Sequence, residues 1–360
     1  MSNELQRAAY SVLLPAVAGL ELDDEVKRYL QRGCVSILLG EAHEEYLVRT
    51  VSFERRRFET QAYFSRITAQ AAALAAGPLL VAVDQEWGAI ERLHGLVAGM
   101  PSVEQLKTMS TEDIELRSYE MAGSARVMGV NLFLAPIVDV FTGSNSWLHG
   151  RNLGPDPAEV ARISCAFIRG VQRAGVAATA KHLPGHYQTE QDPAVELAII
   201  PGAVENLKDG LDVVRQVIEA GVEAIMPDPA VFPALDPLQS ASTSEKVIRL
   251  LRDTSGFDGL IISDDLDAVS ILRGHSITET AVIALKAGAH LLLVSSESGL
   301  DEIAQAIVEA VETGLLERQQ LLKASAKVTG LAEKSRAQVE AGLYVSYSIP
   351  GGHLTRRVRL

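Results

Sequence analysis

The chain has 360 residues, a formal net charge of −13 at pH 7 and 47% hydrophobic residues, which is enough apolar material for one large core. The acidic balance argues against binding to nucleic acid or to an anionic membrane surface, because both need clustered Lys and Arg. Two short basic clusters, Arg55–Arg57 and Arg356–Arg357, are interpreted as a solvated face and a tail.

The cysteines and the apolar stretches bear on location. Cys34 and Cys165 lie far apart without metal-ligand spacing, which favours a reducing compartment. The apolar stretch Ala8–Leu20 follows Glu4 and has no basic flank or clear cleavage site, so we expect no secretory signal. No uninterrupted apolar run reaches the roughly 18 residues of a membrane span. We therefore expect a cytoplasmic protein that does not bind membranes.

Short runs rich in Val, Ile, Leu and Ala recur along the chain between longer amphipathic stretches. In chain order they are Ser11–Ala18, Val35–Leu39, Leu79–Asp84, Leu132–Val140, Ala177–His182, Ala224–Pro227, Leu260–Asp264 and Leu291–Ser295. Continuous apolar runs of this length are typical of strands that are buried on both faces, as in parallel sheets. They predict a parallel sheet.

The segments between these runs have a helical period and charged outer faces. The clearest are Phe58–Ala76, Ala158–Ala174, Ala203–Ala220, Glu245–Thr254 and Thr278–Ala287. Several are followed by a glycine, which tolerates the left-handed conformation that closes a helix. Alternating strands and helices predict an α/β fold, a single (β/α)8 TIM-like barrel. A doubly wound open sheet is the competitor, but no Gly-rich fingerprint follows the first run.

The C-terminal part of the chain differs in pattern from the barrel repeats. Residues from Leu300 to Ala341 predict two helices that pack on the barrel, so we assign residues 1–341 to the barrel domain. Residues 342–360 contain Pro350-Gly351-Gly352 and predict an irregular tail. No low-complexity linker and no sequence repeat divides the chain.

Charged residues follow several of the predicted strands. In (β/α)8 barrels the functional groups lie at the C-terminal ends of the strands. At these positions the sequence has Asp84, Glu86, Asp139, Arg151, Lys181, His182, His186, Asp228, Asp264 and Asp265. Partial burial of a charged group costs free energy, so packing alone would not select these residues. They predict a polar pocket for a small ligand.

Three motifs at these positions resemble glycoside hydrolase family 3, most closely the single-domain bacterial β-N-acetylglucosaminidase of cell-wall recycling. They are KHLPGH at Lys181–His186, SDDL at Ser263–Leu266, and Asp84-x-Glu86 followed by Arg92. The resemblance covers roughly Pro78–Val294 with order and spacing kept. It implies a small carbohydrate or sugar-like substrate.

The resemblance makes Asp264 the nucleophile. It would attack the anomeric carbon and form a covalent glycosyl-enzyme, which water releases with net retention. The residues agree with this role, because Asp264 follows the apolar run Leu260–Ile262 and would point its carboxylate into the pocket mouth. The alternative for Asp264 is an N-cap of the next helix. Asp265 is favoured as that cap or as a supporting partner of the site.

Other positions match family residues that bind sugar hydroxyls. They are Asp84, Arg92, Arg151, Lys181 and His182. A carboxylate accepts from paired hydroxyls while Lys and Arg donate, which would hold a pyranose in register. Lys181 and His182 could also form a buried ion-pair network with Asp139. His186 lies in a Pro-Gly turn, for which we favour loop bracing over catalysis.

The chain departs from the family pattern in the loop after the fifth strand. Where the family type has Asp-Ser-His, with the His as general acid/base, the same register reads Asp192-Pro193-Ala194. A methyl group cannot carry a proton, and such proton transfer contributes ~10²–10⁴-fold in rate.

Nearby departures add to this one. Trp87 and Tyr187 each stand where the family has Gly, and Asp228-Pro229 replaces Ala-His. We interpret them as a remodelled site in which Trp87, Tyr187 and Asp228 contact the substrate.

Three interpretations stay open at this point. The protein is a retaining glycosidase of the β-N-acetylhexosaminidase type in which Glu190, Asp192 or Glu196 replaces the His, since burial can tune such acids upward. Alternatively, its substrate needs no acid, or the site serves another reaction on a sugar-like metabolite. In the third interpretation it is a catalytically silent sugar-binding protein.

Metal chemistry is not expected. His182 and His186 are four residues apart, but Pro184-Gly185 between them prevents a common helical face. No third ligand has suitable spacing, and no phosphate-binding loop is evident. We predict no metal and no cofactor, and the sequence does not indicate an oligomeric state.

Overall fold

The computed structural model describes residues 2–19, 21–42, 45, 51–75, 77–88, 90–341, 344–348 and 355–359. Its centre is a sheet of eight parallel strands in the order β10-β1-β2-β3-β4-β5-β6-β9. They are β1 (Leu13–Val17), β2 (Ser36–Leu39), β3 (Leu80–Val83), β4 (Leu132–Phe133), β5 (Ala177–Leu183), β6 (Ala224–Pro227), β9 (Leu260–Ile261) and β10 (Leu292–Ser295). A parallel bridge between Ile262 and Leu291 joins β9 to β10, so the ring closes. Each strand falls on one of the eight predicted runs, and the (β/α)8 barrel is confirmed.

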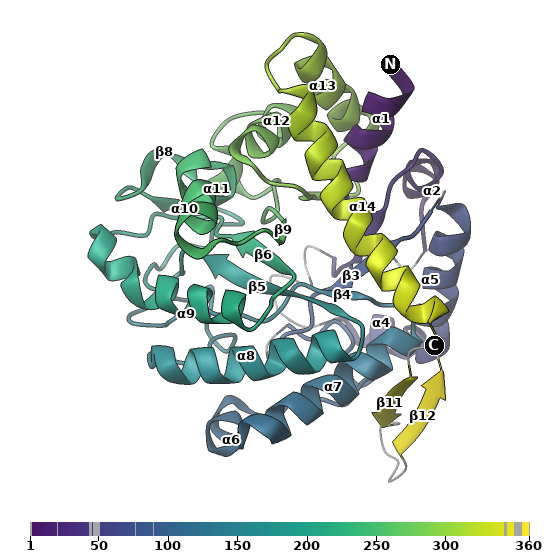
Figure 1. Cartoon of the computed structure of the whole chain (residues 1–360), viewed down its shortest axis with the longest axis vertical. Helices are drawn as coiled ribbons and strands as arrows, with labels where there is room; N and C mark the ends of the chain where they lie inside the picture. Colours follow the sequence, from purple (N-terminus) through teal and green to yellow (C-terminus); the bar gives the residue numbers. More distant parts are fainter. Residues whose placement is uncertain are drawn as a thin grey trace.

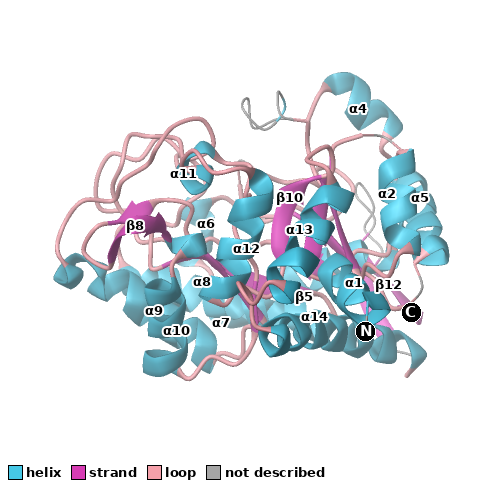
Figure 2. Ribbon diagram, turned by 90° about the horizontal axis from the view of Figure 1, so that it is seen from above, coloured by secondary structure: helices cyan, strands magenta, loops and turns pink. Residues whose placement is uncertain are grey.

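Helices surround this barrel (Figures 1 and 2). They are α1 (Ser2–Ser11), α2 (Asp24–Gln31), α4 (Phe53–Phe58), α5 (Gln61–Leu74), α6 (Val103–Thr108), α7 (Thr111–Val127), α8 (Pro157–Arg173), α9 (Lys208–Glu219), α10 (Glu245–Ser255), α11 (Val269–Leu272), α12 (Ile277–Ala287), α13 (Leu300–Glu312) and α14 (Arg318–Glu340). Two short 3₁₀ turns are η1 (Val204–Leu207) and η2 (Ala241–Thr243). The expected helical segments correspond to α5, α8, α9, α10 and α12. The two helices expected in the C-terminal part are α13 and α14.

Local sequence explains where these helices begin and end. The Asp156 carboxylate accepts from the N–H of Ala158 and Glu159, and Pro157 occupies the first turn of α8, where a missing N–H costs nothing. At the other end of a helix, Gly256 adopts a φ of 62° and closes α10.

The barrel interior is apolar and closed at one end. Side chains from all eight strands form an inner cluster that also includes Val328 and Ala332 of α14. Figure 1 shows α14 crossing the barrel. Lys327 of this helix donates to the carbonyl of Asp258, just before β9. Helix α14 therefore covers the N-terminal ends of the strands, and their C-terminal ends remain for a functional site.

Two hairpins lie outside the barrel. One consists of β7 (Val231–Phe232) and β8 (Asp236–Ser240) and follows β6. The other pairs β11 (Tyr344–Ser348) with β12 (Thr355–Arg359) in antiparallel fashion, and β11 lies beside α7. We expected residues 342–360 to be irregular; part of this tail instead forms strands, and its Tyr344, Val345 and Tyr347 are residue types enriched in strands. Pro350-Gly351-Gly352 falls outside the described residues.

In the described part of the chain, none of the helices has both the length and the apolar character needed to cross a bilayer.

Candidate active site

A buried ionic cluster joins the ends of β3, β4 and β5. Glu86 accepts from Arg151 Nε at 3.0 Å and from Arg151 Nη2 at 2.9 Å. Lys181 Nζ lies 2.9 Å from Glu86 Oε1 and 2.6 Å from Asp84 Oδ1. The side chains of Glu86, Arg151 and Lys181 are almost completely buried, whereas that of Asp84 is 19% exposed. The cluster thus offers one partly open carboxylate held by a buried cation.

The charges of this cluster stabilise one another. Burial alone would raise the pKa of Glu86, but Arg151 and Lys181 outweigh it and lower this pKa to about 2. Burial would lower the pKa of Lys181, yet Asp84 and Glu86 raise it above its usual value. Glu86 and Lys181 therefore remain charged at neutral pH, and the cluster keeps the donors and acceptors that hydroxyl recognition requires.

Two Asp–His pairs lie beside the cluster at the end of β5. His182 Nδ1 is 2.8 Å from Asp139 Oδ2, and His186 Nδ1 is 2.9 Å from Asp228 Oδ2. The backbone N–H of His186 also donates to Asp139 Oδ1 at 2.7 Å. The Trp147 ring lies against both imidazoles, with centroid distances of 4.8 Å to His182 and 4.6 Å to His186. Both rings are thus fixed in orientation by a carboxylate and by Trp147.

The turn that carries His186 is seated on helix α9. Gly185 adopts a φ of +122°, which disfavours any residue with a side chain. A Cβ on Gly210 of α9 would lie 2.4 Å from the Pro184 carbonyl oxygen. This close approach needs glycine at position 210 and holds the turn in place, in keeping with the bracing role expected for His186.

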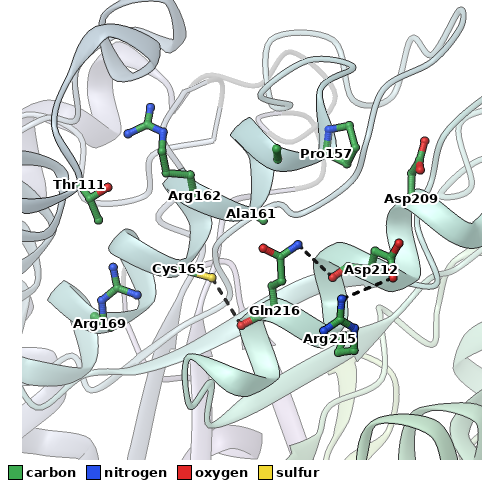
Figure 3. Close-up of a pocket in the computed structure, with 11 residues that line it drawn as sticks. Thr111, Pro157, Ala161, Arg162, Cys165, Arg169, Asp209, Asp212, Arg215 and Gln216 are labelled. Atoms are coloured by element: carbon green, nitrogen blue, oxygen red, sulfur yellow. Dashed lines mark hydrogen bonds and ion pairs between the residues drawn. The ribbon is translucent and has the colours of Figure 1, made fainter.

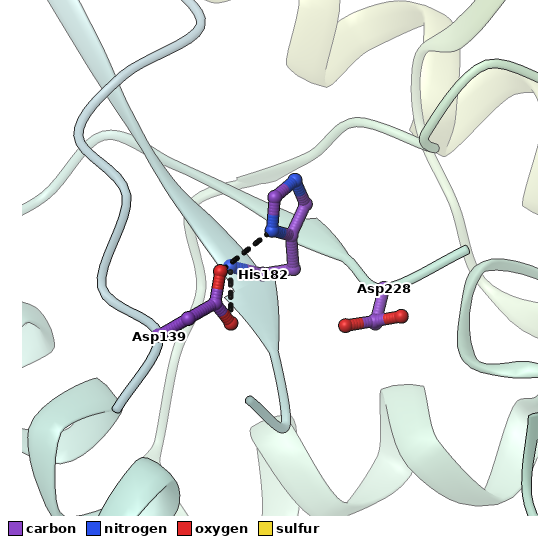
Figure 4. A group of neighbouring side chains, drawn as sticks. All are labelled: Asp139, His182 and Asp228. Atoms are coloured by element: carbon purple, nitrogen blue, oxygen red, sulfur yellow. Dashed lines mark hydrogen bonds and ion pairs between the residues drawn. The ribbon is translucent and has the colours of Figure 1, made fainter. Parts of the chain in front are cut away.

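Asp139, His182 and Asp228 are the group of described residues whose ligand atoms lie within 4.8 Å of one another (Figure 4). Such a set could hold a metal by residue type. In this structure Asp139 accepts from His182, while Asp228 contacts His186 and accepts from the Ala230 N–H at 2.7 Å. The hydrogen-bond network accounts for all three residues.

The Asp264 carboxylate stands at the end of β9. Its Oδ2 lies 3.6 Å from His182 Nε2, and its side chain is 15% exposed. The Oδ1 atom accepts from the Asp265 N–H at 2.7 Å, whereas Oδ2 is buried and has no hydrogen-bond partner. Burial raises the pKa of Asp264, although His182, the Asp265 N–H and Lys181 oppose the rise. Most buried polar atoms in folded proteins are paired. Among the described residues Asp264 Oδ2 is one of six buried side-chain atoms without a hydrogen bond, and His186 Nε2 is another.

Asp264 does not cap a helix. The next helix, α11, has Ala268 as its N-cap residue and no side-chain capping bond. Asp265, the favoured cap from sequence, accepts instead from the Asp267 N–H at 3.1 Å. The capping role is therefore wrong for both Asp264 and Asp265. The other role expected of Asp265, as a supporting partner, agrees with its N–H donating to Asp264 Oδ1.

The loop after β5 carries the residues that were considered as replacement acids. Glu190 is exposed, and its Oε1 accepts from Ser144 Oγ at 3.2 Å. Asp192 Oδ1 accepts from the Ala194 N–H at 2.9 Å, and Glu196 is exposed. Among the described residues, no hydrogen bond or ion pair joins any of these three carboxylates to Asp264.

Some residues that were predicted to bind substrate lie behind the site. Arg92 is buried and makes two 2.7 Å hydrogen bonds to Glu59, and the Asp228 side chain is fully buried against His186. Trp87 is buried, donates to the Arg151 carbonyl at 2.9 Å and packs edge-on against Phe167. Their substrate contacts stay predictions.

The fourth such residue, Tyr187, is half-buried, and its hydroxyl donates to the Pro201 carbonyl on its own loop. The structure brings Asp84, Arg151, Lys181, His182 and Asp264 together at the open end of the barrel.

Sequence reasoning missed three residues of this region. Glu41 follows β2, and burial together with the nearby Asp84 carboxylate raises its pKa to about 7. Its position just after a strand end is the signal that could have found it. Glu59 pairs with both Arg92 and Arg55, and Trp147 contacts both histidine rings. Nothing in the local sequence marks the roles of Glu59 and Trp147.

A surface cavity of about 430 Å³ lies away from these groups, between α8 and α9 (Figure 3). Its lining includes Arg162, Cys165 and Gln216. The cavity shares no residue with the charged site at the barrel mouth.

Comparisons with known proteins agree with the motifs of this site. The sequence profile of the glycosyl hydrolase family 3 N terminal domain matches residues 22–331. A β-hexosaminidase of Nitrosomonas eutropha is 30% identical over 309 residues, which cover 82% of this chain and 89% of that protein. A β-hexosaminidase of Idiomarina loihiensis is 28% identical, covering 91% of this chain and 96% of that protein.

Solved structures give the same relationship. A glycoside hydrolase family 3 β-N-acetylglucosaminidase from Paenibacillus sp. str. FPU-7 superposes with a TM-score of 0.83 at 29% identity. The match covers 93% of this chain and 63% of that one, so that protein is considerably longer. A β-N-acetylhexosaminidase from Beutenbergia cavernae has a TM-score of 0.79 at 23% identity, over 92% of this chain and 99% of that one, which supports the fold.

Proposed function

The chain belongs to glycosyl hydrolase family 3, and from this premise we propose that it is a retaining glycosidase of the β-N-acetylhexosaminidase type that acts on a small glycoside. The observation that carries the proposal is the Asp264 carboxylate at the barrel mouth, whose buried Oδ2 accepts no hydrogen bond and lies 3.6 Å from His182 Nε2. A nucleophile needs a free lone pair aimed at the reacting carbon, and a fully hydrogen-bonded carboxylate would be a weaker one.

The ionic cluster supports binding of the sugar. Asp84 is partly open and accepts hydrogen bonds, while Lys181 behind it and the neighbouring Arg151 donate. In the closed ring of eight strands β3 and β9 lie opposite each other, so Asp84 and Asp264 face one another across the barrel mouth. A sugar ring held by Asp84 at one edge would present its anomeric carbon toward Asp264.

In the proposed reaction Asp264 forms a bond to the anomeric carbon as the glycosidic C–O bond breaks. The electron pair of that bond stays on the leaving oxygen, which takes up a proton. Water then attacks the same carbon, releases Asp264 and restores the original configuration. His182, oriented by Asp139, lies beside Asp264 and acts as a positioning residue.

The proton donor is the altered part of this site. We assign it to the loop after β5, where Asp192 and Glu190 replace the missing imidazole. Asp192 is half-buried, and its Oδ1 accepts from the N–H of Ala194, the residue in the family's acid/base position. A carboxylic acid there would give up its proton to the leaving oxygen and take one from water in the second step.

Covalent trapping tests the nucleophile directly. The protein is incubated with a fluorinated N-acetylglucosaminyl fluoride that forms the glycosyl-enzyme quickly and releases it slowly. We expect a mass increase of one sugar, mapped to the peptide that contains Asp264, and none with Asp264→Asn. An adduct on another residue, or cleavage of an activated glycoside by Asp264→Asn at the normal rate, would remove Asp264 from the mechanism.

The loop acids are tested by comparing the hydrolysis rates of two variants on two substrates. Asp192→Asn and Glu190→Gln are compared on an unactivated disaccharide and on an activated aryl glycoside. The variant that lacks the true acid should lose about 10²-fold or more on the disaccharide and much less on the aryl glycoside. Equal losses on both substrates would contradict a role in protonation. If the native protein cleaves neither substrate yet N-acetylglucosamine raises its melting temperature, the protein is a sugar binder instead.

A further inference from the structure

Exposed apolar side chains gather on the loop after β5, at the rim of the site. Val195, Leu197 and Ile199 alternate along this loop and are 51%, 44% and 42% exposed. Val269, the first residue of α11, is 45% exposed. Single exposed aliphatic residues are common, but several on adjoining segments point to contact with an apolar ligand or partner.

Hydrogen bonds hold these two segments together. The N–H of Val269 donates to the Ala194 carbonyl at 3.3 Å, and that of Ser270 donates to the Pro193 carbonyl at 3.1 Å. The N–H of Ala198 donates to Ser270 Oγ at 3.2 Å. The exposed side chains of the two segments therefore belong to one surface. We call it the apolar rim, and it consists of Val195, Leu197, Ile199 and Val269.

The apolar rim adjoins the nucleophile side of the barrel mouth. Val269 comes five residues after Asp264, and Ile199 forms a parallel bridge with Val231, which follows β6. The rim thus lies over β6 and β9, whereas Asp84 lies across the ring on β3. Figure 2 shows α11 among the loops at one end of the molecule. A sugar that reaches from Asp84 to Asp264 would leave its aglycone, the leaving group, on the rim side.

We propose that the apolar rim binds the aglycone and that the preferred substrates are β-glycosides of phenols or similar aromatic alcohols. This inference rests on the glycosidase function proposed above and adds the class of leaving group. The surface that would meet the aglycone is aliphatic, and an aromatic ring buries apolar area against such side chains. The expected ligand of the apolar rim thus follows from the position of the rim beside Asp264 as well as from its apolar character.

The chemistry of the step favours the same class. As Asp264 bonds to the anomeric carbon, the electron pair of the breaking C–O bond passes to the aglycone oxygen. A phenolate carries this charge well and needs little help from a proton donor as the bond breaks, whereas an alkoxide requires a proton during bond breaking. The part of the loop nearest Val269 is Pro193-Ala194, which offers no proton, so the supply falls to the carboxylates proposed above, Asp192 and Glu190. An aromatic leaving group depends less on these carboxylates than an alkyl one and also suits the apolar surface.

The test compares three glycosides of one sugar: the glycosyl fluoride, the phenyl glycoside and the naphthyl glycoside. Fluoride needs little protonation and has no apolar surface, so its hydrolysis reports on Asp264 alone. The naphthyl and phenyl compounds have leaving groups of similar acidity but different apolar area. We expect kcat/KM for the naphthyl glycoside to exceed that for the phenyl glycoside by about tenfold, mainly through KM, since one hydrophobic contact is worth about 10-fold or more.

Substitutions locate this preference. In the double variant Leu197→Ser/Val269→Ser, the ratio of the naphthyl rate to the fluoride rate should fall about tenfold. The matched control is Leu315→Ser/Val339→Ser, which changes a Leu and a Val that are 56% and 38% exposed at the α13–α14 turn and in α14. The control should keep the native ratio.

Each outcome decides between the proposals. If the fluoride is cleaved but the native protein shows no naphthyl preference, or the rim variant keeps it, the aglycone inference is wrong while the glycosidase function stands. The same holds if the rim variant changes only the sedimentation coefficient, because the rim would then be a contact between copies of the chain. If none of the three glycosides is cleaved, the proposed function is wrong and the inference fails with it.

Discussion

Replacing Asp264, the proposed nucleophile, should make this protein more stable and abolish the proposed glycosidase activity. Asp264 Oδ2 is buried without a hydrogen-bond partner, and burial raises the pKa of this carboxyl. An unpaired buried acceptor costs about 1–3 kcal/mol, and more when it is charged. Asp264→Asn keeps the shape, removes the charge and places an amide that can donate toward His182 Nε2, now 3.6 Å from Oδ2. We expect a gain of about 1 kcal/mol.

Two measurements on one variant check this reasoning. Calorimetry should show a melting temperature about 1–3 °C higher for Asp264→Asn, and turnover of an aryl glycoside should fall on the order of 10⁴-fold or more. Asp139→Asn is the control, because Asp139 is also a buried carboxylate beside His182, but His182 and His186 outweigh the effect of burial and lower its pKa. That variant should lose about 2–3 kcal/mol. A lower melting temperature for Asp264→Asn with activity retained would show that Asp264 is a structural residue.

Three further predictions concern neighbouring groups. Glu86→Gln removes the buried carboxylate that Arg151 and Lys181 share and should cost about 3–5 kcal/mol in urea unfolding, whereas Glu219→Gln, which breaks an exposed pair, should cost under about 1 kcal/mol. The pKa of Glu86 falls from 4.5 to about 2 on folding, so its contribution to the free energy of unfolding is complete above pH 4.5 and is lost as the pH falls toward 2. When the free energy of unfolding is measured against pH, Glu86→Gln should lack this part of the native pH dependence. An unchanged pH dependence would refute the lowered pKa of Glu86. Ala194→His should raise kcat/KM on an unactivated disaccharide about 10²-fold, and this kcat/KM should then vary with pH around the usual imidazole pKa of about 6.5. No gain on the disaccharide would mean that position 194 does not face the leaving oxygen. Asp228→Asn removes a buried charged partner of His186 and should destabilise the protein by about 2 kcal/mol in the same urea assay, while a neutral result would argue against the bracing role.

The barrel could be predicted because its strands have a simple signature. A strand covered on both faces must be apolar throughout, and runs such as Leu79–Asp84 and Leu291–Ser295 satisfy that condition with no information from elsewhere in the chain. The rule that function lies at strand ends then selected Asp84, Lys181 and Asp264. The same rule applied to β2 would have selected Glu41.

The roles of individual side chains at the site were harder to predict, because partners distant in sequence decide them. Arg92 was expected to contact a sugar, but its guanidinium is held by Glu59, which lies 33 residues earlier. Trp87 follows a strand end like Asp84 and Asp264, yet it turns into the core against Phe167. A local pattern places a residue on the barrel mouth, but only the packing of loops decides whether its side chain faces the ligand or the protein.

The ionic cluster and Asp264 differ in whether their charged groups already have partners, and this difference indicates where activity and stability can be separated. Glu86, Lys181 and Arg151 satisfy one another, so they need no ligand to keep their positions, and any change among them disturbs folding and binding together. Asp264 is different, because its Oδ2 has no hydrogen bond in the resting protein. In the proposed mechanism this oxygen gains a partner only when the anomeric carbon approaches. An interaction that becomes favourable only as the reaction proceeds accelerates the chemical step, whereas one already made with the protein does not. The unpaired oxygen, rather than the ionic cluster, is therefore the feature that distinguishes a catalyst from a sugar-binding protein with the same pocket.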